Sequence, residues 1–146
     1  MYKELYEQPM QKNHTPFQLP EWIACAPFEE YLGIEIIEAA EGRATLSMPF
    51  KVKLAQGVGL MHGGAVTSLA DTAVAMAIKS MVPEGTDFVT VEMSLRFLAA
   101  VREGVVRAEA RAIPLDERKI SGEAEIFNGD VKVAHFKAFF IIKEKG

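Results

Sequence analysis

Apolar and polar residues alternate along much of the second half of the chain, which is the spacing of a β-strand with one buried face. The alternation runs over residues 89–97, 106–112, 119–126 and 134–142. The turns between these segments carry the sequences REG, PLDER and NGD, and the Asn-Gly pair of the last one is typical of a tight hairpin. The pattern therefore predicts four consecutive strands in an antiparallel meander.

In the first of these segments, strict alternation predicts one apolar face and one polar face. Thr90 falls on the polar face, together with Glu92, Ser94 and Arg96. The apolar face is predicted to consist of Val89, Val91, Met93, Leu95 and Phe97.

A different pattern occupies residues 63–81, where small and apolar residues continue for the length of a helix without being confined to one stripe. Such a helix is usually enclosed by other structure. Residues 34–50 indicate two short strands joined at Glu41-Gly42, and a glycine-containing loop follows them. Residues 20–33 predict a short helix that Pro27 kinks or splits and that Gly33 closes.

Together these elements predict one antiparallel sheet curled around one apolar helix, an α+β fold. Residues 1–20 are polar and contain three prolines, so we expect an N-terminal arm there and a single domain over residues 21–146. The length of 146 residues, with 49% apolar and 25% charged residues, fits one globular domain.

Charge and cysteine content narrow the possible partners. A net charge of −4 gives the whole chain no attraction for nucleic acid or for an anionic membrane, and we expect neither as a partner. Cys25 is the single cysteine, which excludes an internal disulfide and a cysteine-rich metal site. The first 20 residues carry charges throughout and lack the apolar core of a secretory signal, so a cytoplasmic location is expected.

Asp71 lies within the predicted apolar helix and is the most informative residue of the sequence. Its helical neighbours three and four positions away are Thr67, Ser68, Val74 and Ala75, so no cation pairs with it inside the helix. Burying an unpaired carboxylate costs several kcal/mol. Two interpretations stay open: Asp71 reaches solvent or an arginine elsewhere, or it is a general base or nucleophile in a dry cleft.

The sequence His62-Gly63-Gly64 precedes this helix and is the second candidate feature. Glycines at a helix start let a ligand approach the backbone, whose N–H groups and dipole stabilise negative charge. This is the chemistry of an oxyanion site. A flexible loop and a structural histidine are the alternatives. The chain has no G-x-S-x-G elbow, no metal-binding spacing and no phosphate loop, so no metal or cofactor is expected.

Three segments taken together resemble a known family. They are LGIEIIEAAEGRATLSMPF, GLMHGGAVTSLADTAVAMAI and VTVEMSLRFLAA, and with the order of elements they are similar to the hotdog-fold acyl-CoA thioesterases of the PaaI-like, phenylacetate-degradation type. The resemblance covers residues 27–142. It implies a sheet wrapped around a central helix, protomers that join their sheets into a dimer, pairs of dimers that form a tetramer, and an active site at the dimer interface.

The resemblance also implies roles for individual residues. The acidic catalytic residue, nine positions after the histidine, is Asp71, and the glycine whose N–H polarises the thioester carbonyl falls on Gly63 or Gly64. In the mechanism that the resemblance implies, the Gly64 N–H holds the carbonyl oxygen. Gln56 stands six positions before the histidine, where the family often has Asn. Thr90 matches a hydroxyl residue that places the attacking water in some members.

The remaining implied contacts are with the substrate. Arg118 and Lys119 lie in the hairpin where related enzymes often place basic residues against the nucleotide phosphates, and His62 and Gly63 complete the expected substrate-binding set. The implied reaction is hydrolysis of a fatty or aromatic acyl-CoA, with coenzyme A as part of the substrate. A hotdog protein that binds acyl-CoA without cleaving it and a hotdog dehydratase or hydratase are the alternatives.

Overall fold

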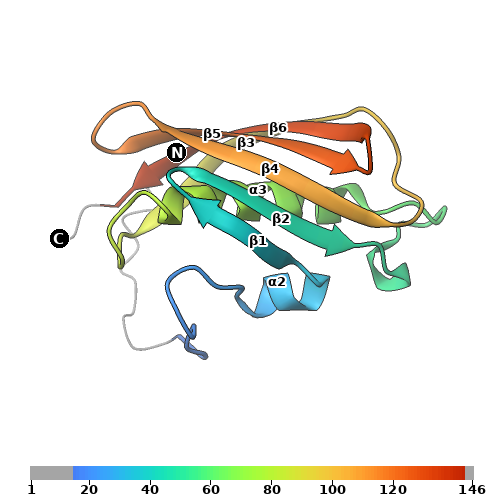
Figure 1. Ribbon diagram of the computed structural model, residues 1–146, viewed down its shortest axis with the longest axis horizontal. Coiled ribbons are helices and arrows are strands. Elements are labelled where there is room, and N and C mark those ends of the chain that lie inside the picture. Colours follow the sequence, from blue (N-terminus) through green and yellow to red (C-terminus); the bar gives the residue numbers. More distant parts are fainter. Residues whose placement is uncertain (1–14, 144–146) are drawn as a thin grey trace.

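One long helix lies against the inner face of a six-stranded antiparallel sheet, as Figure 1 shows for the computed structural model. The structure describes residues 15–143. The order of the strands across the sheet is β1-β2-β4-β5-β6-β3. The elements are α2 (Pro27–Leu32), β1 (Glu35–Ala40), β2 (Arg43–Pro49), the 3-10 turn η1 (Val52–Leu54), α3 (Gly63–Lys79), β3 (Phe88–Phe97), β4 (Val105–Pro114), β5 (Lys119–Asn128) and β6 (Val131–Ile142).

The prediction of a four-stranded meander is wrong for its first strand. Strands β4, β5 and β6 do follow one another, but β3 pairs with β6 at the sheet edge, and β4 pairs with β2. The alternation of residues tells which face of a strand is buried, but not which strand lies beside it. The inner face of β4 is formed by Val106, Ala108 and Ala110, which are all buried where α3 crosses β2, β4 and β5.

Small residues let α3 approach the sheet closely. A Cβ atom built on Gly122 of β5 would lie only 2.2 Å from Cγ1 of Val74, so the helix packs directly on the backbone of that strand. Leu69, Val74 and Ile78 of α3 are fully buried against Phe136 and Phe140 of β6 and the other core residues. The predicted enclosed helix over residues 63–81 is thus confirmed, and it ends at Lys79.

The predicted helix over residues 20–33 is shorter than expected. Residues 20–26 are irregular, and Pro27 begins α2 rather than kinking it, because proline suits the first helical position, where no N–H is needed. Gly33 closes α2 in the left-handed region with φ 78°, as predicted. Trp22 instead docks on the end of α3, where its Nε1–H donates to the Lys79 carbonyl at 2.9 Å and Lys79 Nζ lies 4.7 Å from its ring.

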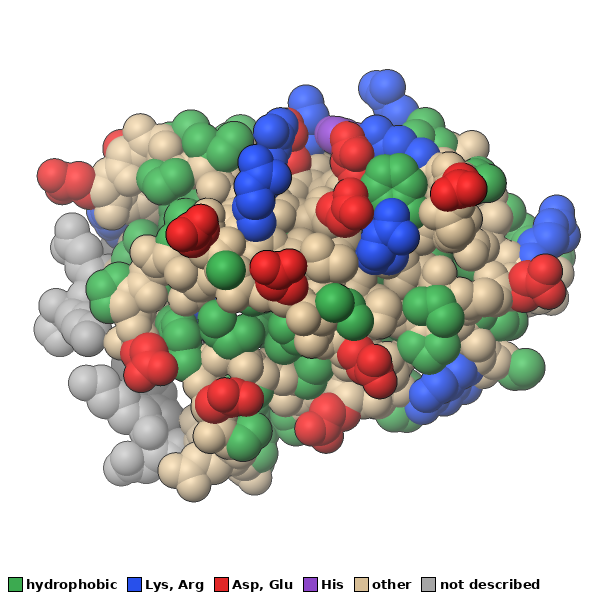
Figure 2. All heavy atoms as spheres, in the orientation of Figure 1, with side chains coloured by type: hydrophobic (Ala, Val, Ile, Leu, Met, Phe, Trp, Pro, Cys, Tyr) green, Lys and Arg blue, Asp and Glu red, His purple; other side chains and the backbone are tan. Residues whose placement is uncertain are grey.

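Most of the proposed N-terminal arm lies outside the described residues, and the boundary at residue 20 stays a prediction. Within residues 15–143, no helix combines the length and apolarity needed to cross a membrane. Acidic and basic side chains intermingle on the face shown in Figure 2, so neither sign forms a continuous patch there.

The contact between Gly122 and Val74 gives a test of the packing. We expect Gly122→Ala to lower the free energy of unfolding by about 1–3 kcal/mol, because the new methyl group overfills the core. Val74→Ala is also destabilising by itself, but in the double variant it makes room for that methyl group. Denaturant unfolding at fixed protein concentration should therefore show a double variant that is more stable than the sum of the two single effects predicts.

The matched control is Gly57→Ala. A Cβ atom on Gly57 meets nothing within 4 Å, and its backbone does not lie in the left-handed region. Its unfolding midpoint should stay close to that of the wild type. Strict additivity of the two core changes would show that α3 does not rest on Gly122.

Candidate active site

His62 caps the start of α3. Its backbone is extended, with φ −61° and ψ 133°, and its Nδ1 accepts a hydrogen bond of 2.8 Å from the Gly64 N–H. Its carbonyl oxygen accepts from the Ala65 N–H at 2.9 Å. The imidazole is exposed, and its position is determined by this cap. The cap occupies one of the donors that a helix leaves free at its first turn.

The Gly63 N–H is left as the open donor at this helix start. No acceptor for it is found among the residues that the structure describes, whereas the Gly64 N–H is taken by His62. The ring of Phe97 covers the other side of Gly63, because a Cβ atom there would lie 2.9 Å from Cζ of Phe97. The mechanism implied by the resemblance assigned the carbonyl oxygen to the Gly64 N–H, but this group is bonded to His62, so the amide that stays open to a ligand is that of Gly63.

Asp71 lies in the third turn of α3, half-buried, and Thr90 Oγ1 donates a hydrogen bond of 2.9 Å to its Oδ1. No basic side chain in the described part of the chain forms an ion pair with it. Burial raises the pKa of the Asp71 carboxyl above its ordinary value, the Thr90 hydrogen bond opposes this shift, and the negative charge of Glu29 adds to it. The carboxylate is therefore kept in a poorly solvated place without a compensating cation.

A β-bulge in β3 brings Thr90 to Asp71. Thr90 is opposite Phe140 of β6 and Glu92 is opposite Phe139, so Val91 is the extra residue. The bulge reverses the alternation: Thr90 faces α3, whereas Glu92 and the later even-numbered residues face away from it. The prediction that Val89 shares the face of Met93, Leu95 and Phe97 is therefore wrong. A regular strand would have turned Thr90 away from Asp71.

Gln56 shapes the loop that leads to His62. Its Oε1 accepts from the Val58 N–H at 2.6 Å and from the Leu60 N–H at 3.3 Å, and its own N–H donates to the Leu60 carbonyl at 2.8 Å. The side-chain amide is thus committed to the loop through its oxygen. Its NH₂ group has no acceptor among residues 15–143 and remains available as a donor.

Arg118 and Lys119 are not brought to this site within one chain. They lie in the β4–β5 hairpin, where the Asp116 carboxylate accepts from both of their backbone N–H groups, at 2.8 and 2.7 Å. The Lys119 ammonium lies 4.5 Å from the ring centre of Phe139 on the outer face of the sheet. The neighbouring Ile120 is buried against the core, so Lys119 and Asp71 are on opposite faces.

Within one chain, the Gly63 N–H and the Asp71 carboxylate lie far apart along α3. Gly63 and Asp71 are eight residues apart on α3, which corresponds to about 12 Å along the helix axis. The Gly63 end of the site carries exposed apolar residues of β3 and the loop after it, with Met93, Phe97 and Leu98 at 43, 56 and 50% exposure. Sequence reasoning assigned Phe97 only to an apolar face, and nothing in the alternation indicated its contact with Gly63.

Within residues 15–143, no three His, Cys, Asp or Glu side chains are grouped so that they could hold a metal ion. The groups at the start of α3 and around Asp71 are a carboxylate, a hydroxyl, an amide side chain and a backbone N–H.

Comparison with known proteins places this arrangement in a family. Residues 58–135 match the family model of the thioesterase superfamily. The 1,4-dihydroxy-2-naphthoyl-CoA hydrolase of Listeria monocytogenes is 34% identical over 104 residues, which cover 66% of this chain and 84% of the relative. The proofreading thioesterase EntH of Klebsiella pneumoniae is 33% identical over 98 residues, covering 67% and 72% of the two chains.

A solved structure supports the same family assignment. The phenylacetic acid degradation protein PaaI of Thermus thermophilus superimposes with a TM-score of 0.73 at 25% identity, covering 80% of this chain and 98% of that protein. The resemblance stated from the sequence motifs is confirmed, as are the α+β class and the wrapped helix. The chain belongs to the thioesterase superfamily, as a thioester hydrolase with the hotdog fold of the PaaI-like type.

Proposed function

We propose that this protein hydrolyses the thioester of a fatty or aromatic acyl-CoA to the free acid and CoA, at a site built by two protomers. The observation that carries the proposal is Asp71, a half-buried carboxylate that Thr90 holds in place without a cation. The Listeria relative is named for the hydrolysis of an acyl-CoA, which supports this class of substrate.

The distance along α3 supports a shared site. A donor and a base that act on one carbonyl group must both lie within about 3–3.5 Å of the reacting atoms. Gly63 and Asp71 of the same chain are separated by about 12 Å along the helix, so they cannot do so together. Strand β3 is an edge strand with exposed apolar side chains, and joining two such edges would bring Gly63 of one protomer toward Asp71 of the other.

In the proposed mechanism, the Gly63 N–H and the positive end of the α3 dipole hold the carbonyl oxygen, on which negative charge develops. Asp71 of the partner takes a proton from water, whose oxygen adds to the carbonyl carbon. The C–S bond then breaks, and CoA leaves as the thiol with a proton from Asp71. Direct attack by Asp71, which gives a mixed anhydride that water hydrolyses, remains the second route.

The other predicted residues have supporting roles in this proposal. Thr90 orients the Asp71 carboxylate, and Gln56 fixes the loop before His62 and offers its NH₂ group to the water or the acyl group. Lys119 faces away from Asp71 of its own chain, and Arg118 lies beside it in the β4–β5 hairpin, so in this proposal their contact with CoA phosphates belongs to the site of another protomer. Dimer and tetramer formation and a cytoplasmic location also stay predictions.

Two variants separate the roles of Asp71 and Gly63. Asp71→Asn should lower kcat by about 10²–10⁴, the usual contribution of a general base. Gly63→Pro should lower kcat by about 10²–10³, because it removes one oxyanion donor. Proline suits the first turn of α3, and the extended backbone of His62 is compatible with a following proline. Release of CoA is measured with a thiol reagent on a panel of short-chain, long-chain and aromatic acyl-CoA substrates.

Gly63→Ala is the matched control, since it places a similar Cβ against Phe97 but keeps the N–H, and it should retain most of the activity. Asp71→Asn should be at least as stable as the wild type at neutral pH, because it removes a charge whose burial is unfavourable. Mixing and refolding the Asp71→Asn and Gly63→Pro proteins should restore about a quarter of wild-type turnover, since half of the sites in mixed dimers are intact. No recovery would contradict the shared site, and full activity of Asp71→Asn would remove the proposed base.

The pH dependence of kcat/KM tests whether Asp71 is the titrating group. The reaction needs ionised Asp71, so activity is lost as pH falls through the pKa of this carboxyl. The Thr90 hydrogen bond lowers that pKa, and Thr90→Val, which has no hydroxyl, should therefore move the acidic limb of the pH profile to higher pH.

Thr90→Ser keeps the hydroxyl and should leave this limb near its wild-type position. An unchanged limb in Thr90→Val, with a well-folded protein, would show that the titrating group is not Asp71. A protein that binds acyl-CoA but releases no thiol from any substrate would favour the non-catalytic alternative, and hydration of an enoyl-CoA would favour the hydratase.

A further inference from the structure

A short helix with an acidic residue lies beside the proposed base. In Figure 1, α2 lies on the side of α3 that faces away from β4, β5 and β6, and the two helices are in contact. Glu29 of α2 is half-buried, and Leu32, three positions later on the same side of the helix, is buried in the core. Phe28, Glu30 and Tyr31 are exposed. Glu29 is therefore on the side of α2 toward α3, whereas Glu30 is on the solvent side.

The start of α2 fixes the position of Glu29. Its Oε1 accepts a hydrogen bond of 3.4 Å from the Ala26 N–H, which is the capping contact of an acidic side chain at the third helical position. Its carbonyl oxygen accepts from the Ile34 N–H at 3.0 Å. None of the ion pairs among residues 15–143 includes Glu29, so no cation of the described chain neutralises this carboxylate.

The charge of Glu29 acts on two residues of α3. Burial has the largest effect on each pKa, raising that of Asp71 and lowering that of Lys79, and the negative charge of Glu29 raises both. Asp71 and Lys79 are eight residues apart, about two helical turns, with Ala75 between them in the same row of side chains. Since Ala75 ends at its methyl group, no long side chain of α3 separates the three charges.

Lys79 is the only cation of α3, and the other elements around Asp71 do not supply one. Strand β3 contributes the neutral hydroxyl of Thr90 at 2.9 Å, and α2 contributes the negative charge of Glu29. Whether Asp71 keeps its negative surroundings thus depends on where the Lys79 ammonium is held.

Trp22 holds the Lys79 ammonium in place by contacts at both ends of the lysine. Lys79 Nζ donates to the Trp22 carbonyl oxygen at 3.0 Å and lies 4.7 Å from the centre of its ring, and Trp22 Nε1–H donates to the Lys79 carbonyl oxygen at 2.9 Å. We call these contacts the Trp22–Lys79 clamp. Long side chains of a helix point back toward its N-terminus, which here is the direction of Ala75. Released from Trp22, the ammonium could therefore extend over Ala75 toward Glu29.

We propose that Glu29 is a positioning residue of the base: its negative charge, fixed on the inner side of α2, makes the Asp71 carboxylate a stronger proton acceptor, and the Trp22–Lys79 clamp keeps the cation of α3 from cancelling that charge. This role rests on the proposed function and deepens it, because it concerns how Asp71 takes a proton from water. General-base catalysis improves as the base becomes stronger, as long as it stays ionised at the operating pH.

Glu29→Gln removes the charge but keeps a side-chain oxygen for the Ala26 N–H. The acidic limb of the pH profile of kcat/KM should move to lower pH, because the Asp71 carboxyl loses a neighbouring negative charge. The plateau kcat should fall by less than the factor of about 10²–10⁴ expected for Asp71→Asn, with KM nearly unchanged. The matched control is Glu30→Gln, which makes the same change in net charge on the solvent side of α2 and should keep the wild-type limb and kcat.

Trp22→Ala tests the clamp. The released Lys79 ammonium should pair with Glu29, so the acidic limb should move to lower pH, in the same direction as in Glu29→Gln. In a Lys79→Met background there is no cation to release, and adding Trp22→Ala should then leave the limb where it is. A shift of the same size with and without Lys79 would show that Trp22 supports only the fold, and no shift in Trp22→Ala would show that the clamp holds nothing back.

The titration of Asp71 itself separates this role of Glu29 from the proposed hydrolysis. Carbon NMR of the side-chain carboxyl, assigned by the signal that Asp71→Asn removes, follows the protonation of Asp71 without any substrate. The midpoint should be lower in Glu29→Gln than in the wild type and unchanged in Glu30→Gln. Equal midpoints in Glu29→Gln and the wild type would overturn the role of Glu29 even if acyl-CoA is hydrolysed. A lowered midpoint without thiol release from any substrate would instead remove the proposed function.

Discussion

The close packing of α3 on the sheet is the constraint on which the rest of the structure depends. Val74 lies where a side chain on Gly122 would be, and alanines line the inner faces of β4 and β5, so the helix lies almost on the strand backbones. This contact buries one side of α3 completely and leaves the other side at the border of the core. Asp71 is on that border, which is why its carboxylate loses most of its solvent without acquiring a cation.

The border position would be only a cost to stability without the bulge in β3. One extra residue, Val91, changes which side chains face α3. Thr90, which regular alternation would place on the polar face of the strand, thereby becomes the hydrogen-bond donor to Asp71. Bulges are common beside active sites because they redirect a side chain without changing the fold. The cost of a poorly solvated carboxylate is thus offset in part by one local irregularity at the sheet edge.

The sequence determines some of these features more directly than others. The presence of the strands follows mostly from periodicity, because burial on one face imposes a repeat of two residues on the chain, and α3 follows from a run of small and apolar residues of helical length. The position of β3 beside β6 and the bulge at Val91 depend on pairing between distant segments, which leaves no periodic trace. For the same reason, the motif placed His62 just before the helix that contains Asp71, but only the hydrogen bonds show that His62 takes the Gly64 N–H and leaves that of Gly63 open.

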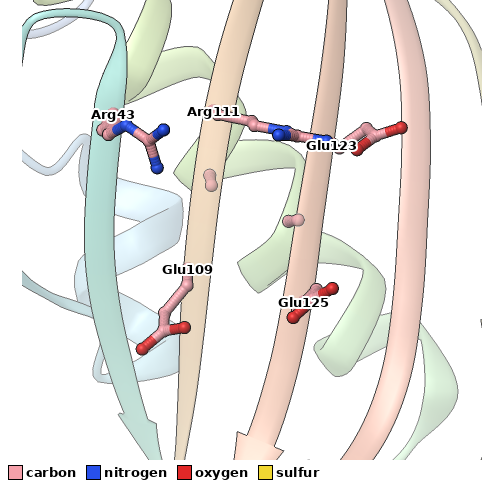
Figure 3. Close-up of a pocket in the computed structure, with 7 residues that line it drawn as sticks. Arg43, Glu109, Arg111, Glu123 and Glu125 are labelled. Atoms are coloured by element: carbon pink, nitrogen blue, oxygen red, sulfur yellow. Dashed lines mark hydrogen bonds and ion pairs between the residues drawn. The ribbon is translucent and has the colours of Figure 1, made fainter.

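The two sides of the sheet have different physical characters. The edge strand β3 exposes Met93 and Phe97 beside the proposed catalytic groups, so an apolar contact there can exclude water from the reacting thioester. The outer face carries charged side chains such as Arg111 and Glu123 (Figure 3), whose attraction is screened by salt, whereas α3 with Asp71 packs on the other face. The core residues of the sheet separate the two faces, so the charges of the outer face do not hydrate the proposed site.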